Sequence, residues 1–262
     1  MKQILAEQPK ATIVIVHGAF EHSGRYEWLA NRFCDEGYHC IYGDLPAHGE
    51  HDGKKGHIDS FQEYVATISK WVEQADTFGL PIFLLGHSMG GLAVIRTLQE
   101  KTLPIERVIL SSPSLGLTFN PPKPLKVIAS GLNILAPKIK FKSKMSSELV
   151  TRDPIVRAND EQDELILKKV SVKWFSELNK GMKVAFEKIN SYPNLPTLVM
   201  QAGDDKIVDK GNTRKWFDSL TIEEKSYKEW GNLYHEIFND PEKEKVFQYA
   251  KAFIELHSPK AT

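Results

Sequence analysis

The chain has 262 residues, of which 41% are hydrophobic and 26% are charged, as in an ordinary folded globular protein. Lys plus Arg and Asp plus Glu number 34 each, so no net charge attracts the chain to nucleic acid. The two cysteines, Cys34 and Cys40, lie in apolar patterns and are expected to be core thiols of a reducing compartment. Charged and polar residues at 7–10 interrupt the N-terminal apolar stretch, so we expect no signal sequence and a cytoplasmic protein.

Short apolar runs alternate with longer helical patterns along the first part of the chain. This alternation predicts a mostly parallel central sheet with helices on both faces. The residue range 60–75 is the clearest helix, because Ser60 and Glu63 form a capping box and apolar residues follow at helical spacing. The strands expected in this part are 11–16, 39–42, 81–85 and 107–111.

The rhythm of strands and helices stops at about residue 118 and resumes at about residue 195. Between these positions we find helical patterns, such as 125–135 and 175–189, and no convincing strand. We therefore expect a helical cap at 118–194, inserted into a core made of 1–117 and 195–262 and folded over the carboxyl edge of the sheet. The core then continues with strands at 197–201 and 225–230 and a closing helix that begins at Asp240 and Pro241.

The sharpest motif is Gly86-His87-Ser88-Met89-Gly90, which follows one of the predicted strands and opens a helix. A G-x-S-x-G sequence in that context is typical of a nucleophile elbow, a strained turn that exposes the serine hydroxyl above the sheet. Glycines are needed on both sides because the turn leaves no room for side chains. The motif predicts Ser88 as a catalytic nucleophile.

Attack by a serine on an acyl group requires hydrogen-bond donors for the oxyanion that develops. The backbone N–H of Met89 follows the nucleophile and lies at a helix N-terminus, so it is one expected donor. The turn after the first long strand reads His17-Gly18-Ala19-Phe20, and the Ala19 N–H is the second expected donor.

The acid that orients the base is expected after a late strand of the sheet. The segment after 197–201 offers Asp204, Asp205 and Asp209. Asp209 precedes a helical pattern and is expected to be its N-cap. Spacing alone does not decide between Asp204 and Asp205.

Of the nine histidines, His235 alone follows the acid in the chain and also lies in a loop just after a strand. That order and placement predict His235 as the base that deprotonates Ser88. His17 and His87 belong to the two turns already described, where we expect them to brace the backbone. The loop of His48, His51, Asp52 and His57 lacks zinc-type spacing, so no metal and no other cofactor is expected.

Over nearly its full length the chain resembles the monoacylglycerol lipase and lysophospholipase branch of the α/β-hydrolases, which includes proteins filed as serine aminopeptidases. The resemblance is carried by the segments 17–26, 44–49, 56–58, 86–91, 111–113 and 234–236, and the bacillus-type lysophospholipase-like proteins look most similar. The family pattern implies an α/β-hydrolase fold and places the acid at Asp205.

The resemblance also implies hydrolysis of one fatty-acyl ester, of monoacylglycerol or lysophospholipid, through an acyl-enzyme. Carboxylesterase or thioesterase activity on smaller acyl esters, or a prolyl iminopeptidase-like activity, are the alternatives. The family's substrate contacts fall on Glu21 and Arg25, although a salt bridge that braces the oxyanion turn explains this pair equally well. Phe20 stands where some members have glycine, which narrows the entrance beside Ala19.

The first part of the predicted cap carries lysines and no acidic residue between Thr118 and Ser147. Together with interleaved apolar residues, this composition suits either peripheral contact with an anionic lipid surface or a solvated lysine-rich loop. A small lipid ester is thus the expected partner, nucleic acid is not, and the oligomeric state stays open. The lysines are Lys123, Lys126, Lys138, Lys140, Lys142 and Lys144.

Overall fold

A computed structural model describes residues 1–119, 133, 135–142 and 145–256. Its central sheet has seven strands in the order β1-β3-β2-β4-β5-β8-β9. Neighbouring strands are parallel except for β1, which pairs antiparallel with β3 at one edge. The strands are β1 (Lys2–Ile4), β2 (Ala11–Val16), β3 (Tyr38–Tyr42), β4 (Ile82–His87), β5 (Arg107–Ser111), β8 (Thr197–Ala202) and β9 (Lys225–Trp230).

The strands predicted from apolar runs are confirmed in this sheet. Every residue of β2, β3, β4, β5 and β8 is buried, as expected for parallel strands covered on both faces. The sequence reading missed β1 because three residues give no recognisable period and two of them are exposed.

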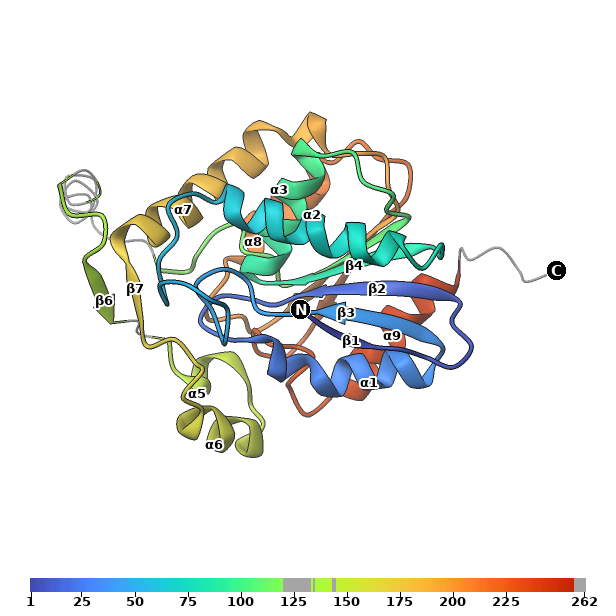
Figure 1. The fold of residues 1–262 in the computed structure, drawn as a ribbon, viewed down its shortest axis with the longest axis horizontal. Coiled ribbons are helices and arrows are strands. Elements are labelled where there is room, and N and C mark those ends of the chain that lie inside the picture. The colour runs from blue at the N-terminus through green and yellow to red at the C-terminus, as the bar shows by residue number, and fades with distance from the viewer. Residues whose placement is uncertain (120–132, 134, 143–144, 257–262) are drawn as a thin grey trace.

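Helices cover both faces of the sheet, as Figure 1 shows. The helices α2, α3, α7 and α8 lie on one face and α1 and α9 on the other, and a separate cluster of buried apolar side chains fills each interface. This arrangement confirms the predicted α/β architecture. The bounds are α1 (Glu27–Asp35), α2 (Gln62–Asp76), α3 (Met89–Glu100), α7 (Val172–Glu187), α8 (Lys210–Ser219) and α9 (Lys243–Glu255).

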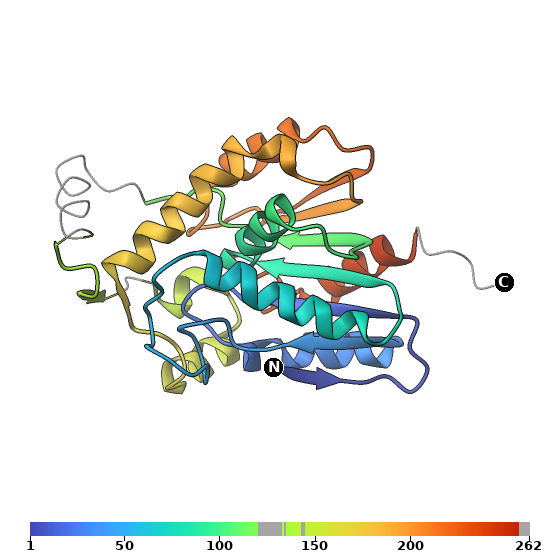
Figure 2. The same cartoon turned by 45° about the horizontal axis from the view of Figure 1, so that its top comes forward.

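Four short elements lie beyond the carboxyl ends of the parallel strands, at the left of Figures 1 and 2. They are the helices α5 (Ser147–Val150) and α6 (Pro154–Gln162) and an antiparallel pair of short strands, β6 (Lys140–Lys142) and β7 (Lys169–Ser171). The sequence reading missed both strands, since each has only three residues. Most of the predicted helical pattern 125–135 and the lysines at 123, 126 and 144 lie outside the described residues.

Two predicted helix starts have different outcomes. Asp209 is the N-cap of α8 and accepts a hydrogen bond from the Gly211 N–H, as predicted. The closing helix begins at Lys243 rather than at Asp240, because the Asp240 carboxylate accepts hydrogen bonds from Tyr234 N and from Arg152. The Asp240 carboxylate thus binds the loop before the helix and does not cap the helix.

Cys34 and Cys40 are both free thiols, as the sequence predicted. Cys40 is buried as expected, but Cys34 is partly exposed and is not a core thiol. Within the described ranges, none of the helices combines the length and the apolar character that crossing a bilayer requires.

Candidate active site

Ser88 lies in a strained turn between β4 and α3. Its backbone has φ 52° and ψ −120°, a conformation that residues other than glycine rarely adopt. Close packing explains the neighbouring glycines, because a Cβ on Gly90 would lie 2.3 Å from the Val16 carbonyl oxygen and one on Gly86 would lie 2.7 Å from the Gly90 carbonyl oxygen. The turn therefore has the geometry that the G-x-S-x-G motif predicts.

The structure brings Ser88, His235 and Asp205 together from three separate loops. His235 Nε2 lies 2.8 Å from Ser88 Oγ, and His235 Nδ1 lies 2.9 Å from Asp205 Oδ2. All three side chains are nearly or fully buried. The distances match those of a nucleophile, a base and an orienting acid in hydrogen-bond contact.

The charges of this group are set by opposing effects. Burial disfavours the charged form of His235, but the charge and hydrogen bond of Asp205 outweigh it and raise the pKa of His235 above its ordinary value of 6.5. Burial likewise favours a neutral Asp205, but His235 and two backbone N–H groups hold the pKa of that carboxyl below its usual range. Asp205 is therefore ionised at neutral pH and stabilises a protonated His235.

The acid loop holds Asp205 through both of its carboxylate oxygens. Oδ1 accepts from the N–H groups of Ile207 and Val208 at 2.9 and 2.8 Å, and Oδ2 accepts from Gln201 Nε2 at 2.9 Å as well as from His235. Of the two aspartates that spacing left open, Asp205 is the one beside His235. Asp204 uses its backbone N–H to bond the Leu233 carbonyl.

The turn after β2, which contains the predicted donor Ala19, lies against Ser88. A Cβ on Gly18 would lie 3.1 Å from the Ser88 Cβ. His17 braces this turn: its Nδ1 lies 2.8 Å from the Gly18 carbonyl, and its Nε2 accepts from Leu45 N at 2.9 Å. Burial lowers the pKa of His17 to about 4, so the ring is neutral at pH 7.

Glu21 and Arg25 form a buried ion pair beside the same turn. Arg25 Nε lies 3.2 Å from Glu21 Oε2, and Glu21 Oε1 accepts from the Gly18 N–H and from Tyr26 Oη. Burial, followed by the charge of Glu236, raises the pKa of Glu21 above its ordinary value. The pair has the contacts of the bracing alternative, whereas substrate contact by these residues stays a prediction.

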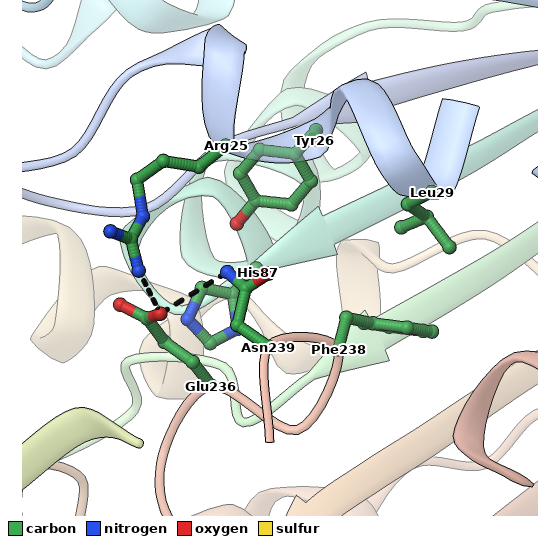
Figure 3. Close-up of a pocket in the computed structure, with 7 residues that line it drawn as sticks. All are labelled: Arg25, Tyr26, Leu29, His87, Glu236, Phe238 and Asn239. Carbon is green, nitrogen blue, oxygen red and sulfur yellow. Dashed lines mark hydrogen bonds and ion pairs between the residues drawn. The ribbon is translucent and has the colours of Figure 1, made fainter. Parts of the chain in front are cut away.

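Arg25 also joins the turn to two other parts of the molecule. Its guanidinium contacts Asp160 at the cap helix α6 and Glu236, the residue after His235. Figure 3 shows Arg25 and Asn239 converging on the Glu236 carboxylate, with His87 behind them. A cavity of about 10 Å³ lies among these side chains. That is roughly the space of one water molecule.

The segment that contains α5 and α6 also contacts the His235 loop. Arg152 Nε lies 3.0 Å from Asp240 Oδ2, and the Glu236 N–H donates to the Val150 carbonyl at 2.8 Å. His22 Nε2 lies 2.7 Å from Asp163 Oδ2 near the end of α6. These contacts join both the His235 loop and the turn after β2 to the one segment 150–163.

Phe20, in the turn after β2, contacts the segment 167–174. Its ring lies 5.3 Å from the Trp174 ring, and its carbonyl accepts from the Leu167 N–H at 2.8 Å. Its backbone φ of 68° lies in the left-handed region, which explains why glycine suits this position in similar proteins. Contact of Phe20 with a substrate remains a prediction.

Sequence reasoning missed four residues that support the site. Ser114 Oγ lies 3.2 Å from Ser88 Oγ, and Gln201, Arg152 and Asp240 make the contacts given above. Ser114 could have been named as a residue at the carboxyl edge of the sheet, because it lies three residues after the predicted strand 107–111. No local signal marks the other three, whose partners are distant in the sequence or follow only from side-chain orientation.

The parallel sheet, the elbow after β4 and the acid and histidine on later loops define an α/β-hydrolase. The family model described as serine aminopeptidase, S33, matches residues 7–242, and the chain belongs to this family.

Two curated relatives show the range of similarity. The chain is 47% identical over 253 residues to phospholipase YtpA of Bacillus subtilis, covering 96% of this chain and 98% of the relative. It is 28% identical over 247 residues to human monoglyceride lipase, covering 87% of this chain and 76% of that protein.

A solved structure of a lipase is also similar to this chain. Monoacylglycerol lipase of Paleococcus ferrophilus superposes with a TM-score of 0.88 at 29% identity, over 98% of this chain and 99% of that one. The chain is therefore a lipase-type ester hydrolase of the α/β-hydrolase fold.

Proposed function

We propose that this hydrolase works through an acyl-enzyme on Ser88, with His235 as the base and Asp205 as the orienting acid. The observation that carries the proposal is the pair of contacts at His235, 2.8 Å to Ser88 Oγ and 2.9 Å to Asp205 Oδ2. Asp205 accepts a hydrogen bond from the Nδ1–H group of His235, so Nε2 presents a lone pair to the serine hydroxyl.

In the acylation step, Ser88 Oγ attacks the ester carbonyl carbon while its proton moves to His235 Nε2. The N–H groups of Ala19 and Met89 stabilise the oxyanion of the tetrahedral intermediate. When that intermediate collapses, His235 gives its proton to the leaving alcohol and the acyl group remains on Ser88. The raised pKa of His235 suits this exchange, because the imidazolium is stabilised by the Asp205 carboxylate.

The proposed substrate is a single-chain fatty-acyl ester, a monoacylglycerol or a lysophospholipid. The support comes from relatives whose names are phospholipase, monoglyceride lipase and monoacylglycerol lipase. We also propose that residues 118–194 act as the cap over the substrate, with Phe20, Glu21 and Arg25 at the head-group side.

A peptidase activity fits the site less well. An aminopeptidase needs an unpaired carboxylate to bind a free amine, whereas the cap residues Asp160 and Asp163 are already engaged by Arg25 and His22. We therefore favour ester over amide substrates.

The exposed side chains around β6 support contact with a lipid surface. Leu135 is 85% exposed and Ile139 is 52% exposed, beside the lysines of the β6 segment. Apolar side chains among lysines suit an interface with anionic lipid. Sedimentation with vesicles tests this part of the proposal: anionic vesicles should retain more protein than zwitterionic ones at low salt, and equal retention would reject it. The exposed residues are Leu135, Ile139, Phe141, Lys138, Lys140 and Lys142.

The substrate proposal is tested by kcat/KM on a matched set of substrates. The set contains monoacylglycerols and lysophosphatidylcholine of equal chain length, p-nitrophenyl esters of graded length, and an aminoacyl p-nitroanilide. We expect long-chain glycerol or phospholipid esters to exceed short esters and the anilide to be inert. A preference for the anilide or for acetyl esters would reject the proposed substrate class.

A further inference from the structure

A second serine hydroxyl lies beside the nucleophile. Ser114 Oγ is 3.2 Å from Ser88 Oγ, and the Ser114 side chain is buried. In the part of the chain that the structure describes, Ser88 Oγ is the one hydrogen-bond partner of this hydroxyl. No helix cap, turn or ion pair therefore accounts for its presence.

The backbone fixes Ser114 in this position. His87 at the end of β4 lies opposite Ser111 at the end of β5, so the segments that follow both strands leave the same edge of the sheet. The Ser114 N–H donates to the Ser88 carbonyl at 2.9 Å, and a Cβ on Gly91 would lie 3.0 Å from Pro113 Cβ. Close packing of the two segments therefore holds the two hydroxyls together.

Counting protons assigns the direction of the bond between the hydroxyls. The ionised Asp205 can only accept, so His235 Nδ1 carries the proton and Nε2 is an acceptor. Ser88 gives its single proton to Nε2 and has none left for Ser114. Ser114 must then be the donor, and its O–H points at the oxygen that reacts.

We propose that Ser114 is a catalytic residue that donates a hydrogen bond to Ser88 Oγ and thereby assists the breaking of the acyl-enzyme. This inference rests on the proposed function of Ser88. In deacylation, water attacks the acyl carbon and gives its proton to His235 Nε2. The carbon–Oγ bond then breaks, its electron pair goes to Oγ, and His235 returns the proton to Oγ, while Ser114 keeps its own proton throughout.

The hydrogen bond from Ser114 to Ser88 Oγ is stronger in the transition state of deacylation than in the acyl-enzyme that precedes it. Oγ of the ester is a weak acceptor, but it gains negative charge as the bond to carbon breaks, and hydrogen bonds to charged groups are stronger than those to neutral ones. The difference corresponds to roughly a 5–10-fold faster deacylation. The acylation rate constant rises less, because the same hydrogen bond also stabilises the Ser88 Oγ lone pair that attacks the substrate.

The test compares Ser114→Ala with Ser114→Cys in stopped-flow hydrolysis of a p-nitrophenyl ester, which gives the acylation and deacylation rate constants separately. Cysteine fills the same space but donates weakly, so it separates hydrogen bonding from packing. We expect both variants to lower the deacylation rate constant roughly 5–10-fold and the acylation rate constant less. Wild-type deacylation in Ser114→Cys, or changes under twofold in both variants, would overturn the inference.

Ser112→Ala is the matched control. Ser112 is also buried, but its hydroxyl accepts from the Ala202 N–H at 3.2 Å and does not contact the nucleophile. It should lower the melting temperature and leave the ratio of the two rate constants unchanged. Failure of the proposed function is a separate result: an active Ser88→Ala enzyme would reject Ser88, whereas an inactive Ser88→Ala enzyme with a normal Ser114→Cys enzyme would reject only the role of Ser114.

Discussion

The loops that carry Ser88 and His235 are held in different ways. The Ser88 turn is fixed by its own backbone, with a φ of 52° and two glycines, Gly86 and Gly90, at which a Cβ would collide with a carbonyl oxygen. The His235 loop is fixed by side chains from elsewhere, since Asp240 binds Arg152 and Glu236 binds Arg25. Placement of Ser88 is therefore a local property, whereas placement of His235 depends on side chains from other segments, among them the one that contains α5 and α6.

The largest expected effect is the loss of kcat on removal of the Ser88 hydroxyl, which contacts His235 and so lies where the two loops meet. Ser88→Ala should lower kcat roughly 10⁵–10⁶-fold, because the nucleophile is lost while the fold remains. The double variant Ser88→Ala, His235→Ala should be no worse than the single one, since the two residues act as a unit. Steady-state ester hydrolysis measures both, and a further large loss in the double variant would show that His235 acts independently of Ser88.

Gly90→Ala tests whether the Ser88 turn depends on the close packing of its backbone. The new Cβ would meet the Val16 carbonyl oxygen at 2.3 Å, and a backbone atom within the sheet cannot move aside. We expect the free energy of unfolding to fall by about 1–3 kcal/mol or more, together with activity. Gly231→Ala is the control, because nothing lies within 4 Å of its Cβ position. Equal stability of the two variants in urea unfolding would contradict this description of the turn.

Arg152→Ala tests whether the His235 loop depends on side chains from other segments, because it removes the contact between Arg152 and Asp240. Asp240 is fully buried and would lose its cation, but Arg152 itself is 29% exposed, so we expect a cost of about 1–3 kcal/mol rather than more. Misplacement of the base should lower kcat roughly 10-fold. Arg214→Ala removes an exposed ion pair with Asp218 and should change neither quantity by much. If Arg152→Ala keeps full activity, as the control Arg214→Ala should, the contact between Arg152 and Asp240 does not position His235.

The smallest expected effect is a shift in pH dependence. His235 must be neutral to accept the serine proton, and its pKa lies above 6.5, so kcat/KM should be lost as the pH falls through a value above 6.5. Burial opposes the raised pKa and Asp205 chiefly causes it, with Glu236 adding to it. Glu236→Gln removes one negative charge and should move this acid limb to lower pH. A limb that stays in place would show that the charge of Glu236 does not reach the ring.

The sequence predicted the local features of this molecule far better than the distant ones. Ser88 and the buried strands could be found because their signals are contiguous: a five-residue motif and unbroken apolar runs. His235 followed from chain order, and its 2.8 Å contact with Ser88 Oγ agrees with that order.

The support of the His235 loop could not be predicted in the same way. Asp240 reads as a helix start by its type and its following proline, yet its carboxylate binds Arg152, which is 88 residues away in the chain. Three-residue strands such as β6 and β7 carry too few side chains to show a period, and they form because they pair with one another. Contacts of this kind are decided by tertiary structure.

The most direct test of the central claim is covalent labelling by a fluorophosphonate followed by peptide mass spectrometry. An activated serine attacks the phosphorus of the probe and displaces fluoride, which leaves a covalent tetrahedral adduct on that serine. We expect a single adduct on Ser88, formed in step with loss of esterase activity and much more slowly in His235→Ala. Labelling of another residue, or full activity after Ser88 is modified, would contradict it.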